Sequence, residues 1–156
     1  MGCCCPGVVG CRVNDYAFTG WNYEPMIRQG EPRAVMFTVE GEPMVKARPR
    51  VTRSGHTYTP KTTVDAEKRV REAFEVTGCE PFSNAVGVEL AFFQGTRARK
   101  DIDNMEKLVL DALNGVAWVD DVQVNVILAR RVYTVKDRAR TVVRIFEASE
   151  GVDIEA

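Results

Sequence analysis

The chain has 156 residues, enough for one domain with a modest core, and its 45% hydrophobic and 28% charged residues are ordinary for a soluble globular protein. No apolar run approaches the roughly 20 residues that span a bilayer, so we expect no transmembrane segment and no membrane partner. The formal net charge of −1 hides an uneven distribution, because residues 46–144 carry 18 basic and 13 acidic side chains, and this middle part could attract phosphates.

The two ends of the chain differ from its middle. Residues 1–33 show no sustained hydrophobic period and lack the basic-then-apolar order of a signal peptide, so we expect a poorly ordered extension. The odd number of cysteines, without zinc-finger spacing, indicates reduced thiols in a cytoplasmic protein. Residues 34–148 are the predicted domain, and residues 149–156 form an acidic tail.

The first half of the domain predicts a strand, a basic loop and a helix. Val35–Glu40 alternates apolar and polar side chains, as a half-buried strand does. Lys46–Arg53 follows as a basic loop. A helix is then expected to start from a cap at Thr62 or Thr63 and to run to about Thr77, ahead of a glycine.

The second half predicts three more strands and a helix. Ala85–Phe93 alternates as a strand, and Asp103–Asn114 has the apolar stripe of a helix. Val122–Val135 and Arg140–Phe146 are two long strands that we expect to form a hairpin. The order β-α-β-α-β-β indicates an α+β domain, in which two helices cover a small mixed or antiparallel sheet.

Acidic residues concentrate around the second helix. Asp101 and Asp103 are two positions apart in an extended approach, so both side chains should point to one side. Lys107 follows one helical turn later. The helix rises ~17 Å, and six extended steps after Gly115 cover ~20 Å. If the chain doubles back there, Asp121 returns beside the first two carboxylates.

Three carboxylates that converge on one point repel one another unless a cation lies between them. Mg²⁺ prefers oxygen ligands and keeps waters that a substrate phosphate can replace, and Mn²⁺ is a possible substitute. Such an ion orients and activates a water for attack on a phosphate. The pattern therefore predicts a metal site of Asp101, Asp103 and Asp121, with Lys107 offsetting the negative charge of the reaction.

Plain structural roles are the alternative for the same residues. Asp103 and Glu106 match the pattern of a capping box. Lys107 is spaced to form surface ion pairs with Asp103 and Asp111, each worth about 0.2–0.5 kcal/mol. The acidic pair that ends in Asp121 suits an ordinary turn. Spacing alone leaves these alternatives open.

Two basic runs are candidates for contact with DNA phosphates. One run immediately precedes the acidic pair, where a scissile phosphate would lie, and the other is the loop after the first strand. The candidate residues are Lys46, Arg48, Arg50, Arg53, Arg97, Arg99 and Lys100. A solvated, charged loop is the alternative interpretation of each run.

The acidic segment resembles a known family. Asp101-Ile102-Asp103-Asn104, with Lys107 after it, is followed by Leu-Asp-Ala-Leu-Asn-Gly at 110–115 and by Trp118-Val119-Asp120-Asp121. This order is similar to that of the RusA family of Holliday junction resolvases. The resemblance covers about Phe37–Glu147 and includes the Lys-Ala-Arg-Pro-Arg run at 46–50.

The resemblance implies a homodimer with one Mg²⁺-dependent site per subunit, which resolves four-way (Holliday) junctions by paired symmetric nicks. Matched position by position, the family's acidic residues fall on Asp101, Asp103 and Asp121, and its lysine falls on Lys107. The expected function is a structure-selective endodeoxyribonuclease. A branched-DNA-binding protein of the same fold without catalysis is the closest alternative, and an assembly protein with a carboxylate-bound cation is a more distant one.

Overall fold

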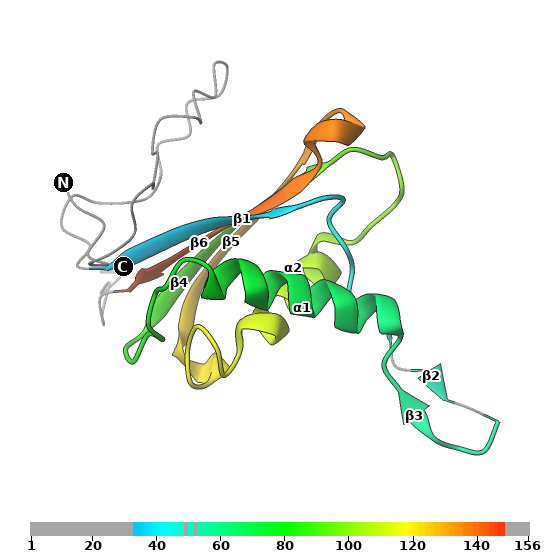
Figure 1. Ribbon diagram of the computed structural model, residues 1–156, viewed down its shortest axis with the longest axis horizontal. Helices are drawn as coiled ribbons and strands as arrows, with labels where there is room; N and C mark the ends of the chain where they lie inside the picture. Colours follow the sequence, from blue (N-terminus) through cyan, green and yellow to red (C-terminus); the bar gives the residue numbers. More distant parts are fainter. Residues whose placement is uncertain (1–32, 49, 52, 149–156) are drawn as a thin grey trace, which may run out of the picture.

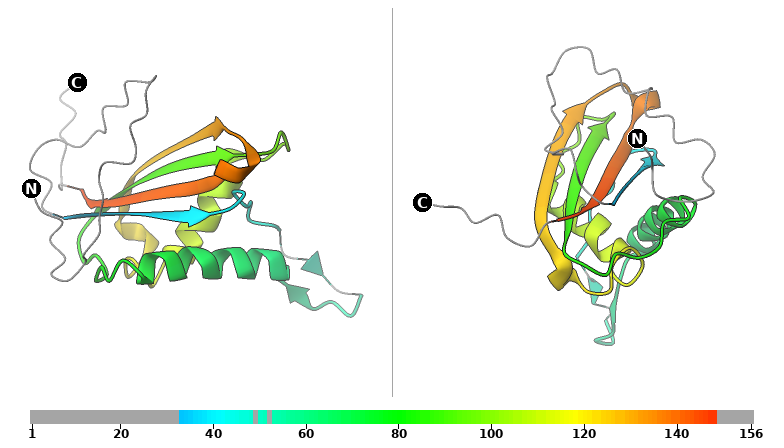
Figure 2. Two further views of the ribbon diagram at one scale, coloured as in Figure 1. Left: turned by 45° about the horizontal axis from the view of Figure 1, so that its top comes forward. Right: turned by 90° about the vertical axis from the view of Figure 1, so that its left-hand side faces the viewer.

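Two layers make up the described part of the chain (Figures 1 and 2). The computed structural model describes residues 33–48, 50–51 and 53–148, and for Arg50 and Val51 it describes the backbone alone. A four-stranded sheet forms one layer, and two helices lie against one of its faces (Figure 2). The sheet is mixed, so the predicted α+β class is confirmed. Residues 1–32 and the acidic tail, 149–156, lie outside the described residues.

The elements are close to their predicted bounds, with one small hairpin in addition. Their order is β1 (Ala34–Glu40), β2 (Arg50–Val51), β3 (Thr57–Tyr58), α1 (Lys61–Glu75), β4 (Val86–Gln94), α2 (Ile102–Leu113), the 3₁₀ turn η1 (Asp121–Gln123), β5 (Val124–Tyr133), the 3₁₀ turn η2 (Lys136–Arg138) and β6 (Arg140–Glu147). The additional hairpin, β2 and β3, projects from the body of the molecule beyond the start of α1 (Figure 1). Its first strand, β2, lies within the segment predicted as a basic loop, and β3 follows that segment.

Arg33 belongs to the folded domain, although we expected it to end the extension. Its guanidinium lies 4.3 Å from the centre of the Phe82 ring and donates a hydrogen bond to the Pro81 carbonyl at 3.2 Å. Its own carbonyl accepts from the Glu147 N–H at 3.0 Å. The described domain therefore begins at Arg33.

The central strand of the sheet is β4. The strand order is β1-β6-β4-β5, with β5 parallel to β4 and β6 antiparallel to both β4 and β1. Every residue of β4 is buried. A strand that is apolar on both faces is favoured at such an interior position. Because α2 connects β4 to the parallel strand β5, the helix must carry the chain back along the sheet from the end of β4 toward the start of β5.

The predicted hairpin of β5 and β6 is wrong. Only the short turn η2 separates these strands in the sequence, but β4 lies between them in the sheet. The chain leaves β5, crosses the end of β4 and enters β6 on its other side; Thr134 N–H donates to the Gln94 carbonyl at this crossing, at 2.9 Å. The alternation of side chains identifies the strands but not the strands with which they pair. Since β5 occupies one edge of β4, β6 pairs with the opposite edge.

Both helices bury apolar stripes against the sheet. The stripe predicted for α2 is buried as expected and consists of Met105, Leu108, Val109, Ala112 and Leu113. The stripe of α1 consists of Thr63, Ala66, Val70 and Phe74. The predicted caps of α1 are wrong, because the helix starts after Pro60 and Thr63 faces the interior, where its hydroxyl accepts from the Ala47 N–H at 3.4 Å. Neither described helix has the length and apolarity that crossing a membrane requires.

A testable prediction concerns the crossing over β4. A Cβ atom added at Gly95 would lie 2.6 Å from the Cα of Lys136. The Lys136 backbone can move away only if the whole connection between β5 and β6 shifts. We predict that Gly95→Ala destabilises the domain by about 1–3 kcal/mol, the usual cost of overpacking, measured as a lower midpoint in thermal denaturation. Val135→Ala, an exposed position in the same connection, is the control. An unchanged midpoint for Gly95→Ala would contradict the crossing.

Candidate active site

Asp101 and Asp103 lie together at the amino-terminal end of α2. Asp101 is the N-cap residue, with extended backbone angles (φ −79°, ψ 133°), and Asp103 lies in the first turn. Both are exposed, and the Asp101 side chain does not cap the helix. Its described contact is a long hydrogen bond of 3.4 Å from Asn104 Nδ2. The predicted capping box on Asp103 is wrong, since the N-cap residue is Asp101, two positions earlier. Both carboxylates remain available to a ligand.

A third acidic side chain, Glu106, lies one turn further along α2. Partial burial raises the pKa of Glu106 above its ordinary value, and the negative charge of Asp103 raises it further. Negative charge therefore accumulates at this end of the helix. A divalent cation bound by Asp101 and Asp103 would offset that charge. Within the described residues, however, no three side chains of the metal-binding types come close enough to hold a metal ion.

Asp121 lies at the opposite end of α2, so the predicted convergence of three carboxylates within one chain is wrong. One oxygen of Asp121 accepts a hydrogen bond of 3.1 Å from Trp118 Nε1. Trp118 is fully buried and pairs with Asn114, the C-cap residue of α2. The 12 residues of α2 rise about 18 Å, so the two ends of the helix are well separated.

The register of the sheet leads to the same conclusion. The first residue of β5 is paired with Val86 and the last with Gln94, along the full length of β4. Near the end of β5, Arg131 Nη1 donates to the Lys100 carbonyl at 2.5 Å, next to Asp101. Asp121 precedes the start of the same strand. The length of β5 therefore separates the two acidic positions.

A tight loop after α2 explains why Asp121 does not return along the helix. Gly115, with a φ of +74°, ends α2 in a conformation that glycine adopts readily. Its N–H donates to the Trp118 carbonyl at 2.9 Å, and the Ala117 N–H donates to the Leu113 carbonyl at 2.8 Å. These bonds fold the loop at the carboxyl end of α2. The path back along the helix is made by β5, and not by the extended segment that we expected.

The two members of the Asp120-Asp121 pair have different environments. The Asp120 side chain accepts from the Val122 N–H at 3.1 Å, and the Gln123 side chain accepts from the Asp120 N–H at 3.1 Å. This reciprocal capping box starts η1 and gives Asp120 a structural role. Asp121 is exposed, and only its bond from Trp118 fixes it in the described structure.

Lys107 is exposed on α2, one turn after Asp103. The surface ion pairs considered for it are not formed: none of the described ion pairs includes Lys107, and Asp111 binds Lys46. The Lys107 ammonium is therefore uncommitted near the acidic end of the helix, where it can meet a phosphate.

Lys46, a candidate for DNA contact, lies in an ion-pair cluster that holds α2 in place. Its ammonium binds Asp111 on α2, and Glu67 on α1 at 3.3 Å. Its backbone N–H donates to the Asn104 carbonyl at 2.9 Å. Partial burial lowers the pKa of Lys46, but the hydrogen bonds and charges of Asp111 and Glu67 outweigh this and raise it. Lys46 is thus charged at neutral pH and linked to both helices.

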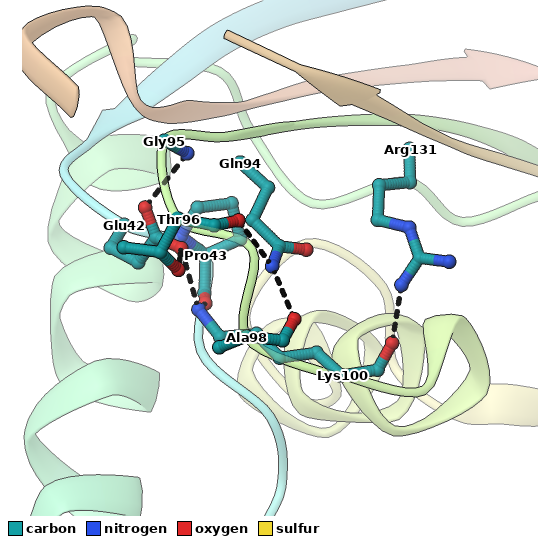
Figure 3. Close-up of polar contacts among 8 residues, drawn as sticks. All are labelled: Glu42, Pro43, Gln94, Gly95, Thr96, Ala98, Lys100 and Arg131. Carbon is teal, nitrogen blue, oxygen red and sulfur yellow. Dashed lines mark hydrogen bonds and ion pairs between the residues drawn. The ribbon is translucent and has the colours of Figure 1, made fainter. Parts of the chain in front are cut away.

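Lys100, the last residue before the acidic pair, is also paired. Its ammonium binds the Glu42 carboxylate at 2.8 Å and the Pro43 carbonyl at 2.7 Å (Figure 3). In the same loop, the Arg97 guanidinium lies 5.2 Å from the centre of the Tyr133 ring. The candidate arginines with exposed side chains are Arg48, Arg53, Arg97 and Arg99. The structure does not describe the side chain of Arg50.

A small mixed α+β domain with two exposed aspartates and a lysine at one helix end suits an enzyme that acts on phosphodiesters. The chain matches the family model for Endodeoxyribonuclease RusA over residues 40–146, well over half of its length. It therefore belongs to the RusA family of endodeoxyribonucleases, as the motif predicted. None of the curated proteins compared with the chain matches it significantly. Membership of this family indicates endodeoxyribonuclease activity on DNA junctions.

The raised pKa of Glu106 leads to a second prediction. Asp103→Asn removes the negative charge that contributes to the shift, so the pKa of Glu106 should fall toward its ordinary value of 4.5. A ¹³C NMR titration of the glutamate carboxyls measures this pKa directly. Asp65→Asn, at an exposed position of α1, should leave it unchanged. The same Glu106 pKa in Asp103→Asn and wild type would show that burial alone accounts for the shift.

Proposed function

We propose that this chain is a Mg²⁺-dependent endonuclease, with Mn²⁺ as a possible substitute, that resolves four-way DNA junctions by paired symmetric nicks. The observation that carries the proposal is the exposed, uncommitted set of Asp101, Asp103 and Lys107 at one end of α2, in a member of the RusA family. Two carboxylates there supply hard oxygen ligands. Burial raises the pKa of Glu106 and the charge of Asp103 raises it further, and that negative charge favours a cation.

A second copy of the chain would complete the metal site. Asp121 is the third acidic residue that the family pattern assigns, but it lies at the far end of α2 from Asp101 and Asp103. A two-fold axis that crosses the middle of β5 at right angles exchanges the two ends of this strand. Such an axis brings Asp121 of one subunit toward Asp101 and Asp103 of the other. We therefore propose a homodimer whose two metal sites each take ligands from both subunits.

The surface along β5 can accommodate a second copy. β5 is an edge strand of ten residues, and Val126 and Ile127 on it are 37% and 39% exposed. None of the described helices covers the sheet face that carries Phe93 and Phe146 (Figure 2). Exposed apolar side chains on an edge strand favour association with another chain.

Different residues of the chain carry out different parts of the proposed reaction. Mg²⁺ bound at the site would activate a water and stabilise charge on the attacked phosphate. Lys107 offsets the negative charge that develops during the reaction. Arg97 and Arg99, exposed in the loop before Asp101, hold the backbone phosphates of the strand. Two such sites related by a two-fold axis match the two equivalent strands of a four-way junction.

A third prediction concerns Lys107. Because its ammonium is uncommitted, Lys107→Ala should leave the fold intact and slow junction cleavage by about 10²-fold or more, the usual effect of losing one electrostatic stabiliser. Single-turnover cleavage of a labelled four-way junction measures the rate. The control is Lys68→Ala, an exposed lysine on α1 that pairs with Glu72 at 3.5 Å. A rate within a few-fold of wild type for Lys107→Ala would mean that this lysine has no catalytic role.

A fourth prediction tests the shared metal site by mixing inactive subunits. Asp101→Asn alone and Asp121→Asn alone should each bind a junction without cutting it, because every site lacks one ligand. In the mixed dimer, one site lacks both ligands and the other is complete, so the mixture should nick a single strand. Strand-specific labelling of the junction, after the subunits have exchanged, detects this nick.

The matched control mixes Asp101→Asn with Asp103→Asn. These two ligands come from the same subunit, so each site of that mixed dimer lacks one and no cutting is expected. Failure of the Asp101→Asn and Asp121→Asn mixture to cut, with dimers present by light scattering, would contradict the shared site. A wild-type chain that binds junctions but never cuts them with Mg²⁺ or Mn²⁺ would favour the non-catalytic alternative.

A further inference from the structure

Three side chains from outside the loop hold the connection between β4 and α2. This connection, residues 95–100, has no helix or strand of its own and leads directly into Asp101. The three side chains come from separate parts of the fold: Glu42 follows β1, Gln94 ends β4 and Arg131 lies on β5. Figure 3 shows them around the loop.

Glu42 binds the loop at both of its ends. Its carboxylate accepts hydrogen bonds from the Gly95 N–H at 2.9 Å and from Thr96 Oγ1 at 2.7 Å, where the loop begins. It accepts another from Lys100 Nζ at 2.8 Å, where the loop ends. Hydrogen bonds to an ionised carboxylate are stronger than those between neutral groups. One side chain, distant in the sequence, thus closes the loop upon itself.

The backbone carbonyls of the loop are bound in turn by Gln94 and Arg131. Gln94 is fully buried, and its Nε2 donates to the carbonyls of Thr96 at 2.8 Å and Ala98 at 2.6 Å. Arg131 Nη1 donates at 2.5 Å to the Lys100 carbonyl, which belongs to the peptide bond between Lys100 and Asp101. The backbone just before the acidic pair is therefore held in one conformation.

The ionisation of Glu42 agrees with this role. Burial raises the pKa of Glu42, but hydrogen bonds from Lys100, Thr96 and Gly95, with the positive charge of Lys100, outweigh it and lower the pKa below its ordinary value. The carboxylate is charged at neutral pH, as the ion pair requires. Its side chain is 27% exposed, so substitution leaves no closed cavity.

We propose that Glu42 is a positioning residue for the metal site: by closing the 95–100 loop, it holds Asp101 ready to bind the cation. This rests on the proposed function, since it takes Asp101 as a metal ligand. When Asp101 is already in position, the free energy of cation binding does not include the entropy cost of ordering the loop. Groups that orient metal ligands typically contribute 10–100-fold to metal affinity or activity. Glu42 acts through Lys100, Thr96 and Gly95 and does not itself touch the substrate.

The test compares Glu42→Ala and Glu42→Gln with the control Glu40→Ala, all in the full chain. Glu40 is an exposed glutamate at the end of β1, two residues away, outside the loop contacts. Hydrogen exchange of a peptide covering 95–101 measures the closure of the loop without metal or DNA. Titration with Mn²⁺, followed by electron paramagnetic resonance, measures cation binding. Cleavage of a four-way junction at increasing Mg²⁺ concentration measures the consequence.

Glu42→Ala should exchange faster in the 95–101 peptide and bind Mn²⁺ about 10-fold more weakly or worse. It should need correspondingly more Mg²⁺ for cleavage, while junction binding without metal stays unchanged. Glu42→Gln keeps one oxygen, which can accept from the Gly95 N–H or from Thr96 Oγ1, and it loses the charge that attracts Lys100, so it should be intermediate. Glu40→Ala should match wild type in all three measurements. If Glu42→Ala does not fold, Thr96→Val removes one of the same hydrogen bonds and is expected to shift each measurement in the same direction.

Two results would overturn the positioning role while leaving the proposed function intact. Unchanged exchange in Glu42→Ala would show that Glu42 does not close the loop. Faster exchange with unchanged Mn²⁺ affinity and Mg²⁺ dependence would show that closure does not position Asp101. A wild-type chain that neither binds Mn²⁺ nor cuts junctions would overturn the proposed function, and the positioning role with it.

Discussion

The burial of β4 on both faces is the constraint on which the rest of the structure depends. In the sheet, β4 has a neighbouring strand on each edge, and the two helices cover one of its faces (Figure 2). Here β6 takes one edge and β5 the other. Because β5 is parallel to β4, the connecting helix α2 runs back beneath the sheet, and its two ends lie at opposite edges of the molecule. The acidic residues at those ends are separated because the helix runs this way and because the loop after Gly115 keeps Asp121 at its carboxyl end.

This separation makes symmetry part of the proposed chemistry. One chain offers two carboxylates and a lysine at one end of α2 and a third carboxylate at the other. Two chains related across β5 would unite these groups twice, at two positions related by the same axis. A cation site that exists only in the pair would also prevent a lone subunit from cutting DNA. Assembly and catalysis would then depend on the same surface.

Positive charge around α2 serves structure, and in the proposed function part of it also binds DNA. Lys46 joins the two helices through Asp111 and Glu67, and Lys100 closes a loop through Glu42. These ion pairs fix the positions of the Lys46 and Lys100 ammonium groups. None of the described ion pairs fixes the guanidinium of an exposed arginine such as Arg99. The basic residues therefore divide into those that build the end of the helix and those, on its surface, that can meet phosphates.

The sequence by itself determined what depends on neighbours a few residues apart. The period of the α2 stripe and the alternation in β4 are local, and each predicted its element correctly. The spacing that places Asp101, Asp103 and Lys107 within the first turns of one helix is local as well. The tertiary structure alone decided which strand β6 pairs with, where Asp121 lies and which carboxylates Lys46 and Lys100 bind. Strand pairing and ion pairs join residues tens of positions apart, and many arrangements satisfy the same local pattern. The path after Gly115 shows this, because hydrogen bonds to Leu113 and Trp118, rather than chain length, set its direction.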